Sequence, residues 1–226
     1  MSSSPGSLGR RASAPGHTPC APTVDYFCKE HTIDTRFDIL IDYYSRLDNL
    51  ISAFRASTGL SCRAGCGWCC ETGDPETTVY EATPLACMIV SDPAHLERYN
   101  AYRGEARRKS CFFHDGSRDF RCSVYGIRPM ICRMFGYAGV RDKHGAVQFA
   151  PCPRMENSER PVVVASVPVF QDLQYTLMSF APPELARLLP FAEALSEAVD
   201  RETIRRRLSP EDGSEDRTPP SFSNAA

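Results

Sequence analysis

The sequence lacks the features of a membrane protein, a secreted protein or a general nucleic-acid binder. It has no run of about 18 apolar residues that could span a bilayer. Two early arginines, Arg10 and Arg11, are followed by no apolar stretch, so we expect no signal peptide. The 26 Lys and Arg residues nearly balance the 28 Asp and Glu residues, which argues against a broad basic surface. We therefore expect a cytoplasmic protein with no membrane partner and no general nucleic-acid binding.

Signs of catalysis are also few. The five histidines are scattered, and none has ligand spacing to the cysteines described below. The sequence shows no paired acid and base, no Ser-His-Asp arrangement and no glycine-rich motif for a nucleotide or S-adenosylmethionine. No catalytic residue is therefore predicted, and the sequence does not decide whether the protein is an enzyme.

Cysteine is the residue present in excess, with 11 among 226 residues. This share is a few-fold above ordinary intracellular usage. Thiols stay reduced in the cytoplasm, and an odd number of cysteines could not all pair as disulfides. Metal binding is therefore the leading explanation of the excess.

Most of these cysteines are closely spaced. The segment Cys62-x3-Cys66-x2-Cys69-Cys70 places four thiols in a short loop, which can direct several thiolates toward one ion or cluster. Because neighbouring side chains of an extended backbone point to opposite sides, Cys69 and Cys70 are expected to divide their roles. With the later cysteines, the thiols could fill two four-cysteine sites, or fill one site and leave spare thiols for redox chemistry.

A second segment surrounds Cys132 with positive charge. Pro129 can open a short helix, which would put Cys132 in the first turns, where backbone N–H groups favour a thiolate. Arg128 and Arg133 are then candidate cofactor-binding residues that do not ligate the metal themselves. Their positive charges would offset the negative charge of an anionic centre. The alternative is that both arginines only pair with surface carboxylates.

Taken together, these motifs resemble the YkgJ-type cysteine cluster proteins, the CxxCxxCC family. The resemblance covers roughly residues 60–152, and both halves of the pattern appear in order. The matching segments are Cys62-x3-Cys66-x2-Cys69-Cys70, Cys111-Phe-Phe, Cys122-Ser-Val-Tyr and Arg128-Pro-Met-Ile-Cys132-Arg. The one departure is Phe112, where the family form has proline.

The resemblance implies a domain that chelates zinc or iron and is presumed to hold an iron–sulfur cluster, such as a 4Fe–4S cluster. The metal ligands that we predict, with Cys152 added at the end of the segment, are Cys62, Cys66, Cys69, Cys70, Cys111, Cys122, Cys132 and Cys152.

The predicted fold class is α+β and mainly helical, with a small cysteine-rich metal-binding core and short hairpins flanked by helices. Residues 1–24 and the acidic residues 209–226 are rich in Ser and Pro and are expected to be disordered tails. Between them, residues 25–208 form the cysteine-cluster domain, with its metal-binding core at 60–152.

Apolar periodicity and capping signals predict the individual elements. The expected helices cover residues 34–57, a segment starting at Thr83-Pro84, residues 93–108, a short turn from Pro129 to Phe135, and residues 168–180 and 183–208. Hairpins are expected over residues 111–122 and 136–150. Gly59 is the predicted stop of the first helix.

Three functions are compatible with these features. The first is a metal-binding protein that holds an iron–sulfur cluster or zinc and works in redox chemistry or electron transfer with an unknown protein partner. The second is a non-enzymatic interaction module stapled by zinc. The third is a methylase-like enzyme, because flagellin lysine methylases are similar in carrying this kind of cysteine cluster.

Overall fold

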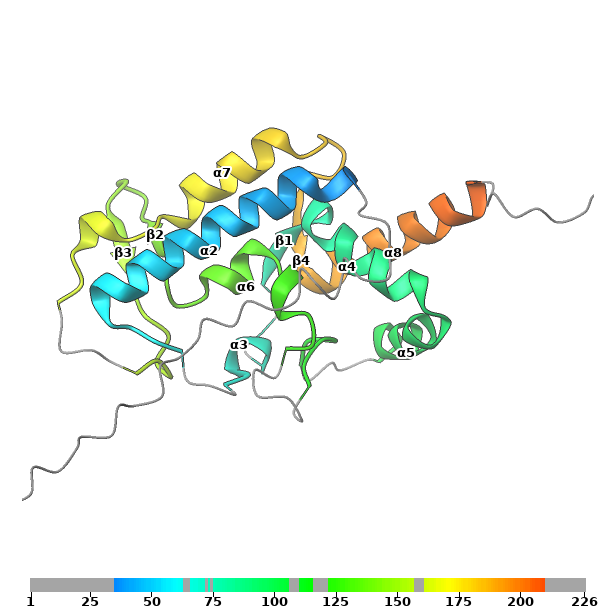
Figure 1. Ribbon diagram of the computed structural model, residues 1–226, viewed down its shortest axis with the longest axis horizontal. Helices are drawn as coiled ribbons and strands as arrows, with labels where there is room; N and C mark the ends of the chain where they lie inside the picture. The colour runs from blue at the N-terminus through cyan, green and yellow to red at the C-terminus, as the bar shows by residue number, and fades with distance from the viewer. Residues whose placement is uncertain are drawn as a thin grey trace, which may run out of the picture. The chain divides into compact units, whose positions relative to one another are not determined.

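The computed structural model confirms a mainly helical α+β fold (Figure 1). It describes residues 35–62, 66–71, 73, 75–105, 110–115, 122–156 and 161–209. Residues 1–24, the predicted start of the domain at residue 25 and residues 210–226 of the predicted C-terminal tail lie outside these residues, so the domain boundaries stay a prediction.

Seven α-helices and two small sheets make up the described part of the chain. The helices are α2 (Asp38–Thr58), α3 (Trp68–Glu71), α4 (Val79–Ser91), α5 (Pro93–Arg103), α6 (Met130–Met134), α7 (Phe170–Phe180) and α8 (Phe191–Leu208). The 3-10 turns are η1 (Thr35–Phe37), η2 (Tyr125–Ile127) and η3 (Val164–Ser166). The antiparallel strand pairs are β1 (Glu76–Thr78) with β4 (Leu188–Pro190), and β2 (Gly139–Arg141) with β3 (Val147–Phe149).

Helix α2 confirms the first predicted helix. Its apolar residues recur at three- and four-residue steps, so they share one face. The buried members of this face include Leu40, Tyr44, Leu47, Ile51 and Phe54. The helix ends at Gly59, as predicted, because this residue takes a positive φ of 73° and its N–H donates to the Arg55 carbonyl at 2.7 Å.

The start of α4 was predicted wrongly. We expected Thr83 as the N-cap and Pro84 as the first helical residue, but the helix begins at Val79 and both residues lie inside it. Thr78 is the N-cap and forms a capping box with Glu81. This reciprocal pair satisfies two backbone donors and therefore starts the helix earlier than the proline signal suggested.

The last predicted helix also needs correction. We expected it to begin at Pro183, but α8 begins at Phe191. Residues Leu188–Pro190 instead pair with Glu76–Thr78 as β4 and β1. Pro190 lacks an N–H and sits at the strand end, immediately before the helix, where no donor is needed.

The other elements agree with the prediction to different degrees. Helix α5 starts at Pro93, as predicted, with Asp92 as its N-cap, but it ends at Arg103, before the expected residue 108. The β2–β3 hairpin and the short helix α6 are confirmed. Of the hairpin expected at 111–122, the described residues show one bridge, between His114 and Cys122; the predicted turn at Gly116 lies outside them.

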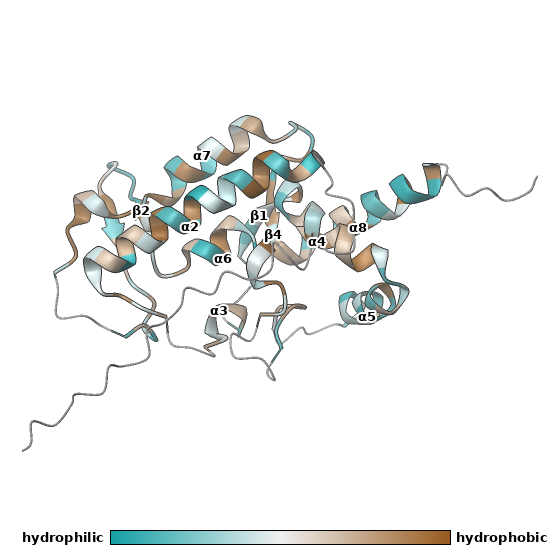
Figure 2. Cartoon of the chain, in the orientation of Figure 1, coloured by the Kyte–Doolittle hydropathy of each residue, from teal (hydrophilic) through white to brown (hydrophobic). Residues whose placement is uncertain are grey.

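The helices pack in two groups that together support the cysteine segments. Helices α2, α6 and α7 share one apolar core, and α2 and α7 lie side by side (Figure 1). Helix α8 packs most extensively on α4. Figure 2 shows that α8 changes from apolar near its start to hydrophilic at its end, where Arg205, Arg206 and Arg207 stand. None of the described helices has an apolar stretch long enough to cross a membrane.

Candidate metal centre

The cysteines lie on short, irregular segments that backbone hydrogen bonds hold together. The Cys111 N–H donates to the Cys70 carbonyl at 2.9 Å, which joins two segments distant in sequence. The Ser123 N–H donates to the Phe113 carbonyl at 2.9 Å beside the His114–Cys122 bridge. These bonds fix the backbone at three of the predicted ligands before any metal is considered.

Helix α3 carries two predicted ligands on a single turn. The Cys70 N–H donates to the Gly67 carbonyl at 2.9 Å, which closes this turn. Consecutive residues of a helix are rotated by about 100°. The thiols of Cys69 and Cys70 nevertheless lie within hydrogen-bonding reach of each other, so the division of roles expected for them stays a prediction.

Cys70 is the centre of a group of thiols. Its side chain lies within hydrogen-bonding reach of the thiols of Cys69, Cys111 and Cys122. Donation from Cys70 lowers the pKa of Cys69 and of Cys122 against the opposing effect of burial. The same hydrogen bonds raise the pKa of Cys70 itself. The group therefore shares protons, so some of its thiols ionise readily while Cys70 keeps its proton.

The remaining predicted ligands join this group through their electrostatic interactions. Burial and the charges of Cys66, Cys69 and Cys152 raise the pKa of Cys62 to about 11. Burial, followed by the charge of Cys111, raises the pKa of Cys132. The structure thus brings all eight predicted cysteines into one connected group, which we call the thiol cluster. Cys62 is exposed and the other seven residues are half-buried.

Arg128 is the cation associated with the thiol cluster. Its charge lowers the pKa of Cys69 and Cys122, although less than the hydrogen bond from Cys70 does. Its guanidinium carbon lies 3.7 Å from the ring centroid of Tyr125, and its Nε atom is buried without a hydrogen-bond partner among the described residues. A buried, unpaired donor beside thiols fits the counter-charge role predicted for this residue.

Arg133 makes a different set of contacts. Its Nη1 pairs with the Asp48 carboxylate at 2.6 Å, its Nε donates to the Arg128 carbonyl at 2.9 Å, and its Nη2 donates to the Gly126 carbonyl. Its guanidinium also lies 4.2 Å from the ring centroid of Tyr44. These contacts join α2 to the segment before α6, so Arg133 braces the backbone around Cys132.

Glu81 is a buried residue that positions the same helix. Its carboxylate is 3% exposed and accepts hydrogen bonds from the Met130 N–H at 2.7 Å, the Thr77 hydroxyl at 2.8 Å and the Tyr44 hydroxyl at 3.2 Å. Met130 is the first residue of α6, two residues before Cys132. Glu81 therefore ties α4 to the helix that carries Cys132.

Tyr137 and Gly136 position two further thiols. The Tyr137 hydroxyl accepts the Cys62 N–H at 2.9 Å. A Cβ atom at Gly136 would lie 2.8 Å from the Cys152 Cβ, so the backbone can approach Cys152 only because this residue is glycine. Nearby, the Glu156 N–H donates to the Ser61 carbonyl at 3.0 Å, which holds the two thiol-bearing segments together.

Aromatic rings stand next to the cluster. Trp68 directly precedes Cys69 and packs edge-on against Phe135, with 6.0 Å between the ring centroids. The Arg154 guanidinium carbon lies 5.7 Å from the Trp68 ring centroid. The Nε2 atom of His114 lies 3.6 Å from the Glu71 carboxylate.

The donor set of the thiol cluster fits zinc or an iron–sulfur cluster. Thiolates are ligands for both, and the pKa values of two thiols of the cluster, Cys69 and Cys122, are lowered. Among the described residues, no three or more His, Cys, Asp or Glu side chains already stand in the arrangement of a formed metal site. The thiols are therefore gathered, and metal binding would require further convergence of their side chains.

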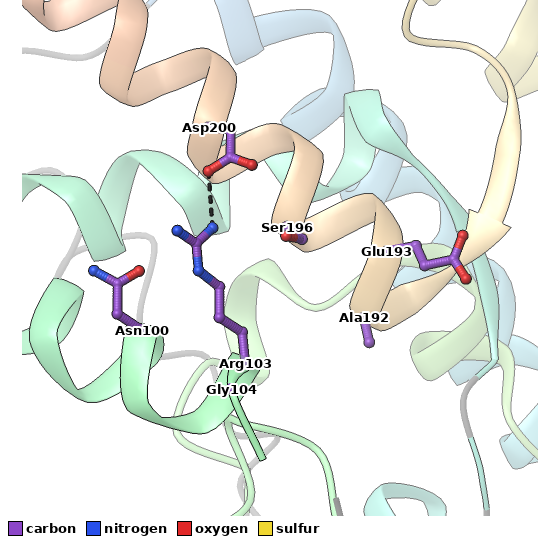
Figure 3. A pocket seen from close by; sticks show the side chains of 7 residues that line it. All are labelled: Asn100, Arg103, Gly104, Ala192, Glu193, Ser196 and Asp200. Carbon is purple, nitrogen blue, oxygen red and sulfur yellow. Dashed lines mark hydrogen bonds and ion pairs between the residues drawn. The ribbon is translucent and has the colours of Figure 1, made fainter. Parts of the chain in front are cut away.

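A cavity lies elsewhere, between α5 and α8 (Figure 3). It has a volume of about 500 Å³ and is lined by Asn100, Arg103, Gly104, Ala192, Glu193, Ser196 and Asp200. Arg103 and Asp200 form an ion pair of 2.8 Å across it. None of its lining residues is a cysteine, so this cavity is not part of the thiol cluster.

The gathered thiols, with Arg128 and the surrounding helices, define a cysteine-rich domain. Residues 61–153 match the model of the CxxCxxCC family, described as a putative zinc- or iron-chelating domain. This match confirms the family resemblance and supports metal binding, but it leaves the metal and the individual ligands as predictions. Neither a curated protein nor a solved structure matches the chain.

Proposed function

We propose that this protein holds an iron–sulfur cluster through its thiol cluster and exchanges electrons with a protein partner. The observation that carries the proposal is the position of Cys70, whose thiol lies within hydrogen-bonding reach of Cys69, Cys111 and Cys122. These four thiols, drawn from three segments of the chain, equal in number the thiolate ligands that such a cluster requires. When bound, an iron–sulfur cluster supplies reversible one-electron chemistry.

The surroundings of the thiol cluster support this role. Arg128 offsets part of the negative charge of the thiolates, and charge near a cluster influences its reduction potential. Trp68, which precedes Cys69 in the sequence, packs against Phe135 beside the thiol-bearing turn of α3. Cys62 is exposed, so the centre lies close enough to solvent for a partner to approach.

A structural zinc site is the second candidate. The segments that carry the thiols contain little regular structure, and one-turn helices and isolated bridges account for most of their backbone bonds. A zinc ion held by four thiolates would fix such segments to the helices. In that case the protein would be a non-enzymatic interaction module.

Anaerobic purification followed by metal and sulfide analysis separates these candidates. Bound iron with acid-labile sulfide and a broad absorbance band near ~400 nm supports the iron–sulfur proposal. Colourless protein with stoichiometric zinc contradicts it and favours the second candidate. Protein that binds neither metal under these conditions contradicts both.

Two alanine variants connect the metal to the thiol cluster. Cys70→Ala removes the central thiol and is expected to lower the bound metal at least severalfold. Cys87→Ala is the matched control, because Cys87 is buried in α4 and its sulfur contacts Arg36 at 3.7 Å. Equal metal content in both variants would contradict the assignment.

A further inference from the structure

We infer that an acidic protein surface docks beside the thiol cluster, where the carboxylates of the electron-exchange partner meet four arginines. The inference rests on the proposed function and adds the charge of the partner and the residues that bind it. Three of these arginines are exposed and one is half-buried. We call them the flanking arginines, and they are Arg55, Arg98, Arg128 and Arg154.

Two flanking arginines stack on rings that neighbour predicted ligands in the sequence. The Arg154 guanidinium carbon lies 5.7 Å from the ring centroid of Trp68, which directly precedes the two cysteines of α3. The Arg98 guanidinium carbon lies 4.8 Å from the ring centroid of Phe112, the residue after Cys111. Both positive charges therefore stand beside thiol-bearing segments.

The other two flanking arginines are held in the same way. The Arg55 guanidinium carbon lies 5.9 Å from the ring centroid of Tyr137, whose hydroxyl accepts the Cys62 N–H at 2.9 Å. The Arg128 guanidinium carbon lies 3.7 Å from the ring centroid of Tyr125 in η2. Stacking uses the flat face of a guanidinium group, so the N–H donors at its edge stay available to a carboxylate.

The flanking arginines differ from most other arginines of the fold in their lack of ion pairs. Arg103, Arg133 and Arg141 pair with aspartates at 2.8, 2.6 and 2.7 Å. Within the described part of the chain, none of the flanking arginines forms an ion pair. An unpaired guanidinium group binds a carboxylate through charge-assisted hydrogen bonds, often two at once. The partner can therefore supply the acceptors that the chain itself does not.

The basic end of α8 is the competing site for an acidic partner. Arg205 and Arg206 both bind the buried carboxylate of Glu202, at 2.6 and 3.0 Å. Their charges are thus partly satisfied inside the molecule. Arg207 stands at the same end without an ion pair among the described residues, but it is one residue against four. The unpaired positive charge is therefore greater beside the thiol cluster.

Carboxylates on the thiol-bearing segments leave the flanking arginines available. Glu71 lies 3.6 Å from the Nε2 atom of His114, and Glu156 accepts a hydrogen bond from the Ser61 hydroxyl at 3.4 Å. Neither carboxylate pairs with a flanking arginine. They offset part of the local positive charge but do not occupy the guanidinium groups.

The aromatic rings favour a protein as the occupant of this surface. Tyr125 is 37% exposed and Trp68 is half-buried, so both can contact a partner together with the arginines stacked on them. Tyr, Trp and Arg are the residues most enriched where proteins bind each other tightly. The chain as a whole has no excess of basic residues to hold a phosphate backbone. An acidic partner would also be steered electrostatically toward the exposed Cys62.

Binding of poly-L-glutamate to the anaerobically purified full chain tests the inference. The labelled polymer is the probe for an acidic protein surface, and its fluorescence anisotropy gives the Kd. We expect binding at low ionic strength that weakens as salt is added. A chain that holds its metal but does not bind the polymer would overturn the inference and leave the proposed function intact. Polymer binding by a chain that holds neither iron nor zinc would overturn the proposed function instead.

Charge-reversal variants locate the binding surface. Arg154→Glu and Arg55→Glu are each expected to raise the Kd severalfold without changing the metal content. Arg207→Glu is the matched control, because it reverses an exposed, unpaired charge at the far end of α8 and should leave the Kd unchanged. A Kd that rises as much in Arg207→Glu as in the other two variants would overturn the inference.

Arginine modification of the wild-type chain covers the case in which a variant does not fold. Phenylglyoxal modifies accessible arginines, and mass spectrometry then locates them. We expect poly-L-glutamate to protect Arg55, Arg98 and Arg154 but not Arg207, and equal protection of all four would overturn the inference. A single-stranded oligonucleotide is the competing probe, and tighter binding of it than of poly-L-glutamate would overturn the assignment of a protein partner.

Discussion

At the scale of single residues, Gly136 illustrates how the thiol cluster depends on close backbone contact. Its φ is 79°, and an added Cβ would lie 2.7 Å from the Met155 Cε and 2.8 Å from the Cys152 Cβ. Gly145 has a similar φ of 82° but no atom within 4 Å of the added Cβ. Replacing either glycine with alanine therefore forces a side chain into a left-handed backbone conformation, but only at Gly136 does the added Cβ also collide with neighbouring atoms.

Gly136→Ala is expected to destabilise the protein more than Gly145→Ala. Both variants carry the cost of a left-handed backbone, about 1 kcal/mol. Crowding against Cys152 adds about 1–3 kcal/mol in Gly136→Ala and lowers its metal content. Urea unfolding and metal analysis of the two variants measure the difference. Equal stability and equal metal content would contradict the role of Gly136.

Glu81 gives a second prediction at this scale. Glu81→Gln replaces a buried acceptor of several hydrogen bonds with an amide whose NH₂ group faces other donors. The expected loss of stability is about 1–3 kcal/mol. Glu76→Gln is the control, because Glu76 is exposed on the adjacent strand. Urea unfolding measures the midpoints of both variants, and only that of Glu81→Gln is expected to fall. An unchanged midpoint for Glu81→Gln would contradict the positioning role of Glu81.

Residues differ in how far the sequence could reveal their roles. Cysteine spacing is a local pattern, so the eight members of the thiol cluster could be selected from it. The Thr78-x-x-Glu81 capping box was also readable, but the Thr83-Pro84 signal was preferred. The pairing of Arg133 with Asp48 links positions 85 residues apart, and no local pattern contains it.

At the scale of elements, the end of α8 is fixed by a buried charge. Glu202 is 2% exposed and accepts hydrogen bonds from Arg205 at 2.6 Å and from Arg206 at 3.0 Å. Arg36, in η1, lies 3.7 Å from the same carboxylate. Burial alone would raise the pKa of Glu202, but the hydrogen bonds and charges of these arginines lower it to about 2.

This pKa predicts how stability depends on pH. The folded value of about 2 is below the ordinary value of 4.5, so the ionised form stabilises the fold. The contribution, on the order of 2–3 kcal/mol, is complete above pH 4.5 and is lost as the pH falls toward 2. Glu202→Gln should remove this part of the pH dependence, as measured by urea unfolding at several pH values. An identical dependence in the variant and the wild type would contradict the prediction.

Element boundaries were less predictable than element types. Helix α2 followed from a long apolar stripe and a glycine stop. Helix α8 was extended too far because Leu185, Leu188 and Leu189 fit a helical period, while the pairing of Leu188–Pro190 with β1 depends on a strand more than 100 residues earlier. Long-range pairing of this kind overrides local periodicity.

At the scale of the whole molecule, the helices supply a core of their own, and the thiol-bearing segments depend on tethers such as Glu81 and Tyr137. Metal binding should therefore stabilise the fold by adding further links between these segments. At a metal concentration 100-fold above Kd, the expected gain is about 2.7 kcal/mol. Thermal unfolding with and without a chelator measures it, and an unchanged Tm despite loss of bound metal would contradict this view.

The central claim, that the thiol cluster holds a metal, is tested most directly by residue-resolved alkylation of the anaerobically purified chain before and after chelation. Cys69 and Cys122 are the most informative positions, because their lowered pKa values of about 6 and about 7 should make them react quickly when no metal is bound. The account predicts that these two thiols react slowly before chelation and quickly after it, while buried Cys87 stays slow in both states. Equal reactivity of Cys69 and Cys122 before and after chelation would contradict the account.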